Sequence, residues 1–190
     1  MYLPIYTYNH PILKEKTKRI VDIDDAILSL AMNMMDTMKH AHGIGLAANQ
    51  VGKGIALTVV DVSDTEGNEH VKPMVLINPE ILEVNGESVF EEGCLSLPGL
   101  REEVTRPEEI LVKYIDVSGA EISAEADGLA ARVIQHEIDH LNGIYFFERL
   151  SKLKQTLVKP ELNKIRRGDV ETEYELAPLP EPKRRKVVAR

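Results

Sequence analysis

The stretch DGLAARVIQHEIDHLNG, residues 127–143, predicts a helix around which the rest of the chain is organised. Asp127 is a typical N-cap residue, and Gly143 lies just past the expected end, where glycine readily adopts the left-handed conformation. His136 and His140 are four residues apart, so their imidazoles project from one face, one turn apart. Two histidines in this arrangement can share a divalent cation.

Glu137 lies one step round the helix from His136, where it can act on a metal-bound water without binding the metal. Leu129 and Val133 share the face of the two histidines. We therefore expect this face to point into the apolar interior, where a metal would satisfy the buried imidazoles. The alternative is a chance match between ordinary core or surface histidines.

A catalytic site of this kind needs a third protein ligand and one open position. One protease pattern is excluded because Phe146 stands where its third histidine would be. A carboxylate from Glu148 or Glu161 is a weak candidate. The single cysteine, Cys94, is the stronger one: Gly93 precedes it and a Pro-Gly turn follows, so its sulfur is expected to be accessible. The alternative is a small buried hydrophobic residue.

A closed structural zinc site is a different class of interpretation. Structural zinc sites usually have four protein ligands. The fourth would have to come from His40, His42 or Asp139, and Glu137 would then have no role.

The remaining sequence indicates an α+β fold, with a run of strands between helices. Apolar residues at three- and four-residue steps predict a helix over residues 23–41, which Gly43 can end. Residues 118–120 form the expected turn of a hairpin, and a third helical stretch, residues 151–167, is interrupted at Pro160. Strand-like runs occur at residues 55–62, 74–77, 87–90, 110–117 and 121–126.

We expect a single compact catalytic domain over residues 1–168, with antiparallel strands around the central metal-binding helix and a C-terminal helical segment. Residues 169–190 are expected to form a flexible tail, since the chain from Glu171 onward is rich in proline and charge.

Composition limits the function further. The 190 residues carry a net charge of −8 and one cysteine, which favours a reducing, cytoplasmic location. Five basic residues fall within residues 183–190, which leaves residues 1–182 at −13. Such an acidic body is a poor partner for DNA. No apolar run approaches the roughly 20 residues that a bilayer requires, so no membrane contact is expected.

Three segments together resemble the peptide deformylase family. They are GIGLAANQ at residues 43–50, EGCLS at residues 92–96 and QHEIDHL at residues 135–141. The resemblance covers about residues 1–155 and includes LINP at residues 76–79 and EADGL at residues 125–129. It does not cover the C-terminal tail.

The resemblance implies that Cys94, His136 and His140 are the metal ligands and that Glu137 is the general acid and base. It also implies the residues that bind the substrate. The Gln50 side chain and the Leu95 N–H would bind the oxyanion, Gly45 would contact the substrate backbone, and Ile44, Phe90, Leu129 and Val133 would line the methionine pocket.

Three charged side chains, of Arg132, Glu92 and Arg106, are expected near this pocket. Arg132 stands in the pocket's helix where an apolar residue is common, and we expect its guanidinium to extend to the rim. Glu92 and Arg106 form either a supporting ion pair or a solvated surface pair.

The implied reaction is hydrolysis of the N-terminal formyl group from the formyl-Met residue of newly synthesised polypeptides, with release of formate. The implied cofactor is one divalent metal ion, commonly Fe²⁺ in the family, with Zn²⁺, Ni²⁺ or Co²⁺ as alternatives. The basic residues 183–190 suggest an electrostatic contact with the ribosome, although a solvated tail without a partner is the simpler interpretation. The competing enzyme class is a zinc peptidase with the same histidine pair.

Overall fold

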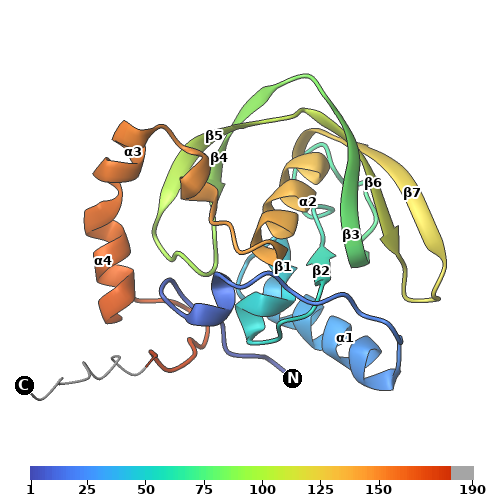
Figure 1. Cartoon of the computed structure of the whole chain (residues 1–190), viewed down its shortest axis with the longest axis horizontal. Helices are drawn as coiled ribbons and strands as arrows, with labels where there is room; N and C mark the ends of the chain where they lie inside the picture. Colours follow the sequence, from blue (N-terminus) through green and yellow to red (C-terminus); the bar gives the residue numbers. More distant parts are fainter. Residues whose placement is uncertain (181–190) are drawn as a thin grey trace, which may run out of the picture.

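A computed structural model describes residues 1–180, which form a compact α+β domain (Figure 1). The α-helices are α1 (Asp25–His40), α2 (Gly128–Leu141), α3 (Lys152–Leu157) and α4 (Lys159–Arg167). Three short 3-10 helices are η1 (Pro11–Leu13), η2 (Ala48–Val51) and η3 (Phe146–Arg149). The strands are β1 (Gly45–Ala47), β2 (Leu57–Val60), β3 (Met74–Asn85), β4 (Ser88–Gly93), β5 (Arg101–Arg106), β6 (Glu109–Ile115) and β7 (Glu121–Asp127).

The strands form two antiparallel sheets with α2 at the centre of the domain (Figure 1). The larger sheet has the order β1-β2-β3-β6-β7, and the smaller one pairs β4 with β5. Apolar residues of α2 pack against the larger sheet, where Ala131 and Ile134 share a cluster with Val60, Leu76 and Val112. The predicted arrangement of antiparallel strands around a central helix is therefore confirmed.

Strand β3 is longer than its apolar residues indicate. The expected strand at residues 74–77 continues to Asn85, through Asn78 and Pro79, with register shifts against β6. Asn78 has a φ of 53°, and its side-chain amide both donates to and accepts from the backbone of Ile20, each at 2.8 Å. These two bonds hold a bend that a periodicity argument does not anticipate.

The predicted helices are present with small differences at their ends. Asp24 is the N-cap of α1 and accepts from the Ile27 N–H at 2.9 Å. The left-handed residue after α1 is His42, with a φ of 54°, and not Gly43 as expected. The predicted interruption near Pro160 separates α3 from α4. Pro160 lies in the first turn of α4, where backbone N–H groups have no acceptor within the helix, so the missing N–H of proline costs no hydrogen bond. None of the helices in residues 1–180 is long and apolar enough to span a bilayer.

The chain after α4 differs from the expectation of a tail that begins at residue 169. It turns back toward the N-terminal residues (Figure 1). There Ile5 bridges to Leu176, with its N–H donating to the Glu175 carbonyl and its carbonyl accepting from the Ala177 N–H, both at 2.9 Å. Ala177 is only 4% exposed. Residues 175–177 are thus packed on the domain, while the basic run at 183–190 lies outside the described residues.

Candidate metal centre and active site

Cys94, His136 and His140 come together as one group, which we call the metal group. Their ligand atoms all lie within 4.8 Å of one another, and the Cys94 Sγ is 3.1 Å from the His140 Nε2. Helix α2 supplies both imidazoles, and the loop after β4 supplies the thiol. Soft sulfur and borderline nitrogen donors at this spacing fit a tetrahedral divalent cation with three protein ligands.

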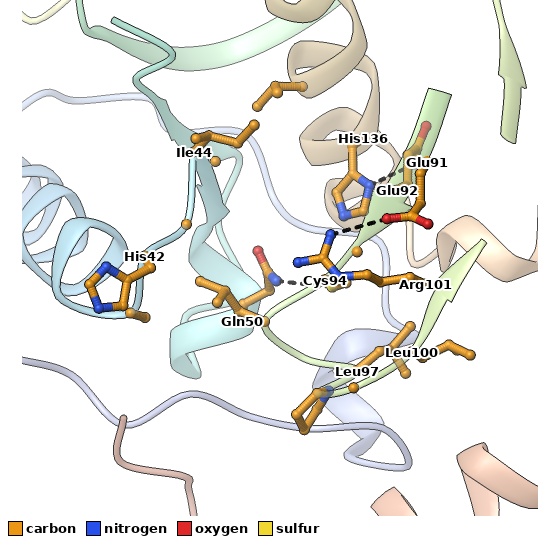
Figure 2. A pocket seen from close by; sticks show the side chains of 18 of the residues that line it. His42, Ile44, Gln50, Glu91, Glu92, Cys94, Leu97, Leu100, Arg101 and His136 are labelled. Atoms are coloured by element: carbon orange, nitrogen blue, oxygen red, sulfur yellow. Dashed lines mark hydrogen bonds and ion pairs between the residues drawn. The ribbon is translucent and has the colours of Figure 1, made fainter. Parts of the chain in front are cut away.

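The orientation of His136 is set from behind by Glu92, at the end of β4. The His136 Nδ1 lies 2.9 Å from the Glu92 Oε2, which leaves the Nε2 to face the metal group. Figure 2 shows His136 and Gln50 on different sides of Cys94, with the His136–Glu92 and Gln50–Cys94 contacts dashed. A carboxylate behind a metal-binding histidine fixes its tautomer and raises its basicity.

Glu92 belongs to a set of five side chains that we call the buried charge network. Its members are Glu92, Arg106, Arg132, Asp139 and Arg149. Arg106 bonds Glu92 through its Nε at 2.6 Å and its Nη2 at 2.9 Å, and reaches Asp139 through its Nη1 at 2.6 Å. Both Arg106 and Glu92 are buried, so they form the supporting ion pair and not the solvated surface pair.

Arg132 also belongs to this network, and the expectation that it extends to the rim is wrong. Its side chain is 3% exposed, and its Nη1 donates to the Glu92 Oε1 at 2.8 Å and to the Val104 carbonyl at 2.9 Å. The guanidinium carbon lies 5.2 Å from the centre of the Phe90 ring. The Glu92 carboxylate and the carbonyls of Val104 and Ser88 all accept from this guanidinium, which makes the interior more favourable for it than the rim.

Glu137 occupies a different environment from the carboxylates of the network. Its carboxyl group is buried next to the metal group, and its Oε2 has no hydrogen-bond partner among the described residues. A Cβ on Gly45 would overlap the Glu137 Oε1, so only glycine allows β1 to pass this close to α2. Burial raises the pKa of Glu137 to about 7, which suits a group that accepts and returns a proton near neutral pH.

The two imidazoles of the metal group have opposite pKa shifts. Burial opposes protonation of His136, but its hydrogen bonds to Cys94 and Glu92 outweigh burial and raise its pKa to about 10. Burial and the nearby positive charges of His136 and Arg106 hold the pKa of His140 well below its usual value. A metal binds only the neutral imidazole, so metal binding would displace the proton held on His136.

Gln50 projects from η2 toward the same group. Its Oε1 accepts from the Ala47 N–H at 2.7 Å, which orients its amide so that the Nε2 faces the Ser96 Oγ at 3.2 Å and the Cys94 Sγ at 3.6 Å. Leu95 lies between Cys94 and Ser96 in the sequence, in the loop after β4. Leu95 and Gln50 both line the same cleft.

The predicted substrate-binding residues share one cleft of about 480 Å³ with most of this machinery. The site residues predicted from the sequence that line it are Ile44, Gly45, Gln50, Phe90, Cys94, Leu95, Leu129, Val133, His136 and Glu137. His140 is the exception: it is 1% exposed and lies against Cys94 from behind.

Three of the alternative ligands considered from the sequence contact other side chains. Asp139 is paired with Arg106 and Arg149. His40 stacks on Tyr2 with ring centres 4.0 Å apart, and Glu148 pairs with Lys14 at 2.7 Å. Among residues 1–180, no fourth histidine, cysteine or carboxylate joins the metal group, so the arrangement fits an open catalytic site better than a closed structural one.

The comparisons with known proteins agree with this geometry. The sequence pattern of the polypeptide deformylase family matches residues 2–156, which is most of the chain. The chain belongs to the peptide deformylase family. Members of this family are metal-dependent hydrolases that remove the formyl group from the N-terminus of new polypeptides, and the chain is an enzyme of this kind.

Individual deformylases are similar over nearly their whole length. The peptide deformylase of Pelodictyon phaeoclathratiforme is 47% identical over 187 residues, covering 96% of this chain and all of that protein. A crystal structure of the Legionella pneumophila deformylase has a TM-score of 0.80 and 37% identity, and covers 89% of this chain and 98% of its own. The Thermus thermophilus deformylase structure gives a TM-score of 0.80 at 40% identity, with 88% and 99% covered.

Sequence reasoning missed two side chains at this deformylase cleft. The Ser96 hydroxyl accepts a hydrogen bond from the Gln50 amide, and its position two residues after Cys94 is the sequence feature that could have identified it. Tyr174 lines the cleft and donates to the Leu95 carbonyl at 2.9 Å, but it lies in the segment expected to be a flexible tail, where no sequence signal identified it.

Proposed function

We propose that Cys94, His136 and His140 hold the catalytic metal of this deformylase and that Glu137 is its general acid and base. The observation that carries the proposal is the buried Glu137 carboxyl group, which has one oxygen without a partner in the described chain and lies beside three converging ligands. A bound divalent cation would lower the pKa of water and polarise the formyl oxygen.

Glu137 then performs both proton transfers. It accepts a proton from the attacking water, and its pKa near 7 lets it return that proton to the leaving nitrogen. The free amine of the polypeptide and formate leave the cleft. Because the Glu137 Oε2 has no protein partner among residues 1–180, no existing hydrogen bond has to break before it acts.

Gln50 and Leu95 would stabilise the negative charge that develops on the formyl oxygen. The Gln50 amide is held by Ala47 and Ser96, so its Nε2 needs little reorganisation to donate to an oxyanion. A preorganised donor of this type is typically worth about 3 kcal/mol in the transition state.

The methionine side chain would lie against Ile44, Phe90, Leu129 and Val133, all of which line the cleft. Gly45 would contact the substrate backbone. Its lack of a side chain is what keeps this edge open beside Glu137 and Val133.

We propose Fe²⁺ as the metal in the cell, with Zn²⁺, Ni²⁺ or Co²⁺ able to replace it. A thiolate with two imidazoles suits soft and borderline cations and disfavours Mg²⁺ or Ca²⁺. The single cysteine supports a cytoplasmic location, where thiols stay reduced.

The ribosome contact of the basic residues 183–190 is a separate proposal on residues outside the described part. Up to about five released counterions predict a ribosome affinity that falls steeply with salt. Deleting these residues should weaken co-sedimentation with ribosomes at low salt and leave hydrolysis of a short formyl-Met peptide unchanged. Unaltered co-sedimentation would remove the tether and leave a solvated tail.

The enzyme proposal is tested by product analysis on metal-loaded protein. Formyl-Met-Ala should yield formate and Met-Ala. A zinc peptidase would instead yield formyl-Met and alanine, and a structural zinc protein would yield neither.

The metal ligands are tested by alkylation of the only cysteine. The Cys94 thiol should resist iodoacetamide in the metal-loaded protein and react once the metal is chelated, because a metal-bound thiolate is a poor nucleophile. Equal rates with and without metal would show that Cys94 does not bind it.

A further inference from the structure

The segment that follows α4 returns to the cleft instead of leaving the domain. Its end is anchored by the two backbone hydrogen bonds between Ile5 and residues 175–177. Just before this anchor, Glu171, Thr172 and Tyr174 line the cleft that Cys94 and His136 also line. The chain therefore closes one side of the cleft with residues that lie far from it in sequence.

Tyr174 connects this segment to the loop that carries Cys94. Its hydroxyl donates to the Leu95 carbonyl at 2.9 Å, and the next carbonyl, that of Ser96, accepts from the Tyr8 N–H at 3.0 Å. Two successive carbonyls of the loop are thus bonded to the C-terminal and N-terminal segments. These bonds restrict the backbone of Leu95, whose N–H is the proposed oxyanion donor.

The segment of residues 171–174 also lies close to the loop at residues 42–43. The Leu95 side chain packs so tightly on Gly43 that a Cβ there would come within 2.8 Å of the Leu95 Cδ1. Beside it, the His42 Nε2 lies 3.7 Å from the Glu173 Oε2. Residues 171–174, Leu95 and the loop at residues 42–43 are therefore neighbours along one side of the cleft.

Glu171 differs from the other carboxylates that line the cleft. Glu91 lies 3.7 Å from Arg101, Glu92 is buried in its arginine network, and Glu137 faces the metal group. Glu171 is exposed and has no ion-pair partner among residues 1–180. Its charge is therefore free to act on whatever part of a substrate lies beside it.

We propose that residues 171–174 are the wall of the cleft that contacts the substrate peptide beyond its formyl-Met residue. Tyr174 is a positioning residue that fixes Leu95, and Glu171 favours a basic side chain in the residues that follow the methionine. This inference rests on the proposed function of the cleft. An exposed carboxylate near a lysine side chain would change KM by roughly two- to fivefold.

The positioning role is tested with Tyr174→Phe, which keeps the ring and removes the hydroxyl. We expect kcat to fall roughly three- to tenfold, the range that one neutral hydrogen bond supports, with KM nearly unchanged and the same fall on formyl-Met-Ala and on longer peptides. Tyr114→Phe, on β6 and outside the cleft lining, is the matched control. An unchanged kcat, or a fall that matches a loss of bound metal or of folded protein, would overturn the positioning role.

The selection of charge is tested with Glu171→Gln and two peptides, formyl-Met-Ala-Lys and formyl-Met-Ala-Glu. The unmodified enzyme should have a lower KM for the lysine peptide than for the glutamate peptide, and Glu171→Gln should remove most of that difference. Glu175→Gln, in the same segment but outside the cleft lining, should keep it.

The outcomes separate this inference from the function on which it rests. If the unmodified enzyme hydrolyses formyl-Met-Ala and shows no preference, or if both glutamate variants behave alike, the wall is not a substrate contact and the deformylase assignment is unaffected. If the unmodified, metal-loaded enzyme releases no formate from any of the three peptides, the proposed roles of the cleft and this inference both fail.

Discussion

The metal group and the buried charge network both include residues of α2, but the buried carboxylates in the two regions differ in their hydrogen bonds. In the network, both oxygens of Glu92 and of Asp139 accept hydrogen bonds from arginine. Beside the metal group, the Glu137 Oε2 has no hydrogen-bond partner among the described residues.

The difference matches the proposed roles: Glu137 transfers protons, and Glu92 and Asp139 hold other side chains in position. A buried polar atom without a partner costs about 1–3 kcal/mol, so it persists where a ligand or a proton transfer needs it. The network offsets the burial of its own charges by pairing them, and through Glu92 it fixes the imidazole of His136. Changes in the first region should therefore reduce turnover, and changes in the second should reduce stability.

The largest effect is expected for Glu137→Ala. Loss of the proposed proton acceptor should lower kcat by about 10²–10⁴-fold while the enzyme still binds metal, because Glu137 is not one of the proposed ligands. Formate release and metal content should be measured on the same sample. Glu125→Gln, an exposed carboxylate on β7, is the control. Near-normal turnover in Glu137→Ala with metal bound would show that another group moves the proton.

Arg106→Leu should be the most damaging change in the network. Removing this arginine deprives both Glu92 and Asp139 of a buried partner, and the free energy of unfolding should fall by about 3 kcal/mol or more. Urea unfolding of the metal-loaded enzyme measures the loss. Unchanged stability with a large loss of kcat would contradict the division between the two regions.

Gln50→Leu should again affect turnover and leave the fold intact. Losing the oxyanion donor should lower kcat by roughly 10²–10³-fold with little change in KM. Ser96→Ala sharpens the test, because it removes one contact that orients the Gln50 amide but keeps the donor. Its kcat should fall between that of Gln50→Leu and that of the unmodified enzyme. Equal losses would mean that the serine itself contacts the substrate.

Features that depend on local spacing could be predicted from the sequence, and features that depend on pairing with other segments could not. The histidine pair and the helix of residues 127–143 were predictable because their spacing is local, and Cys94 was singled out by its flanking glycine and Pro-Gly turn and by the family resemblance. Strand β1 was missed because Gly45–Ala47 is short and rich in small residues, and β5 because Arg101–Arg106 is mostly charged. Both become strands through pairing with a neighbouring strand, β1 with β2 and β5 with β4, which the local propensity of their own residues does not report.

The errors about side chains have the same physical origin. Arg132 was expected at the rim because its helical position is apolar in character, but its partners come from β4 and β5, which are remote in sequence. Residues 175–177 were expected to be flexible because of their composition, although two backbone bonds to Ile5 hold them. For Arg132 and for residues 175–177, hydrogen bonds to residues remote in sequence decide the position, and the polarity of the local sequence does not.

The smallest effect is expected for Arg149→Ala, which sharpens the comparison inside the network itself. Arg149 bonds Asp139 as Arg106 does, but its side chain is 43% exposed, against 2% for Arg106. Water can replace an exposed partner, and Arg106 still pairs with Asp139, so the loss of stability should be at most about 1 kcal/mol. The loss should also shrink at high salt, whereas that of Arg106→Leu should persist. Urea unfolding could instead give equal losses of stability for the two variants at low and high salt. Burial would then not decide how much each arginine stabilises the network, and the bond that each makes to Asp139 would have to explain both losses.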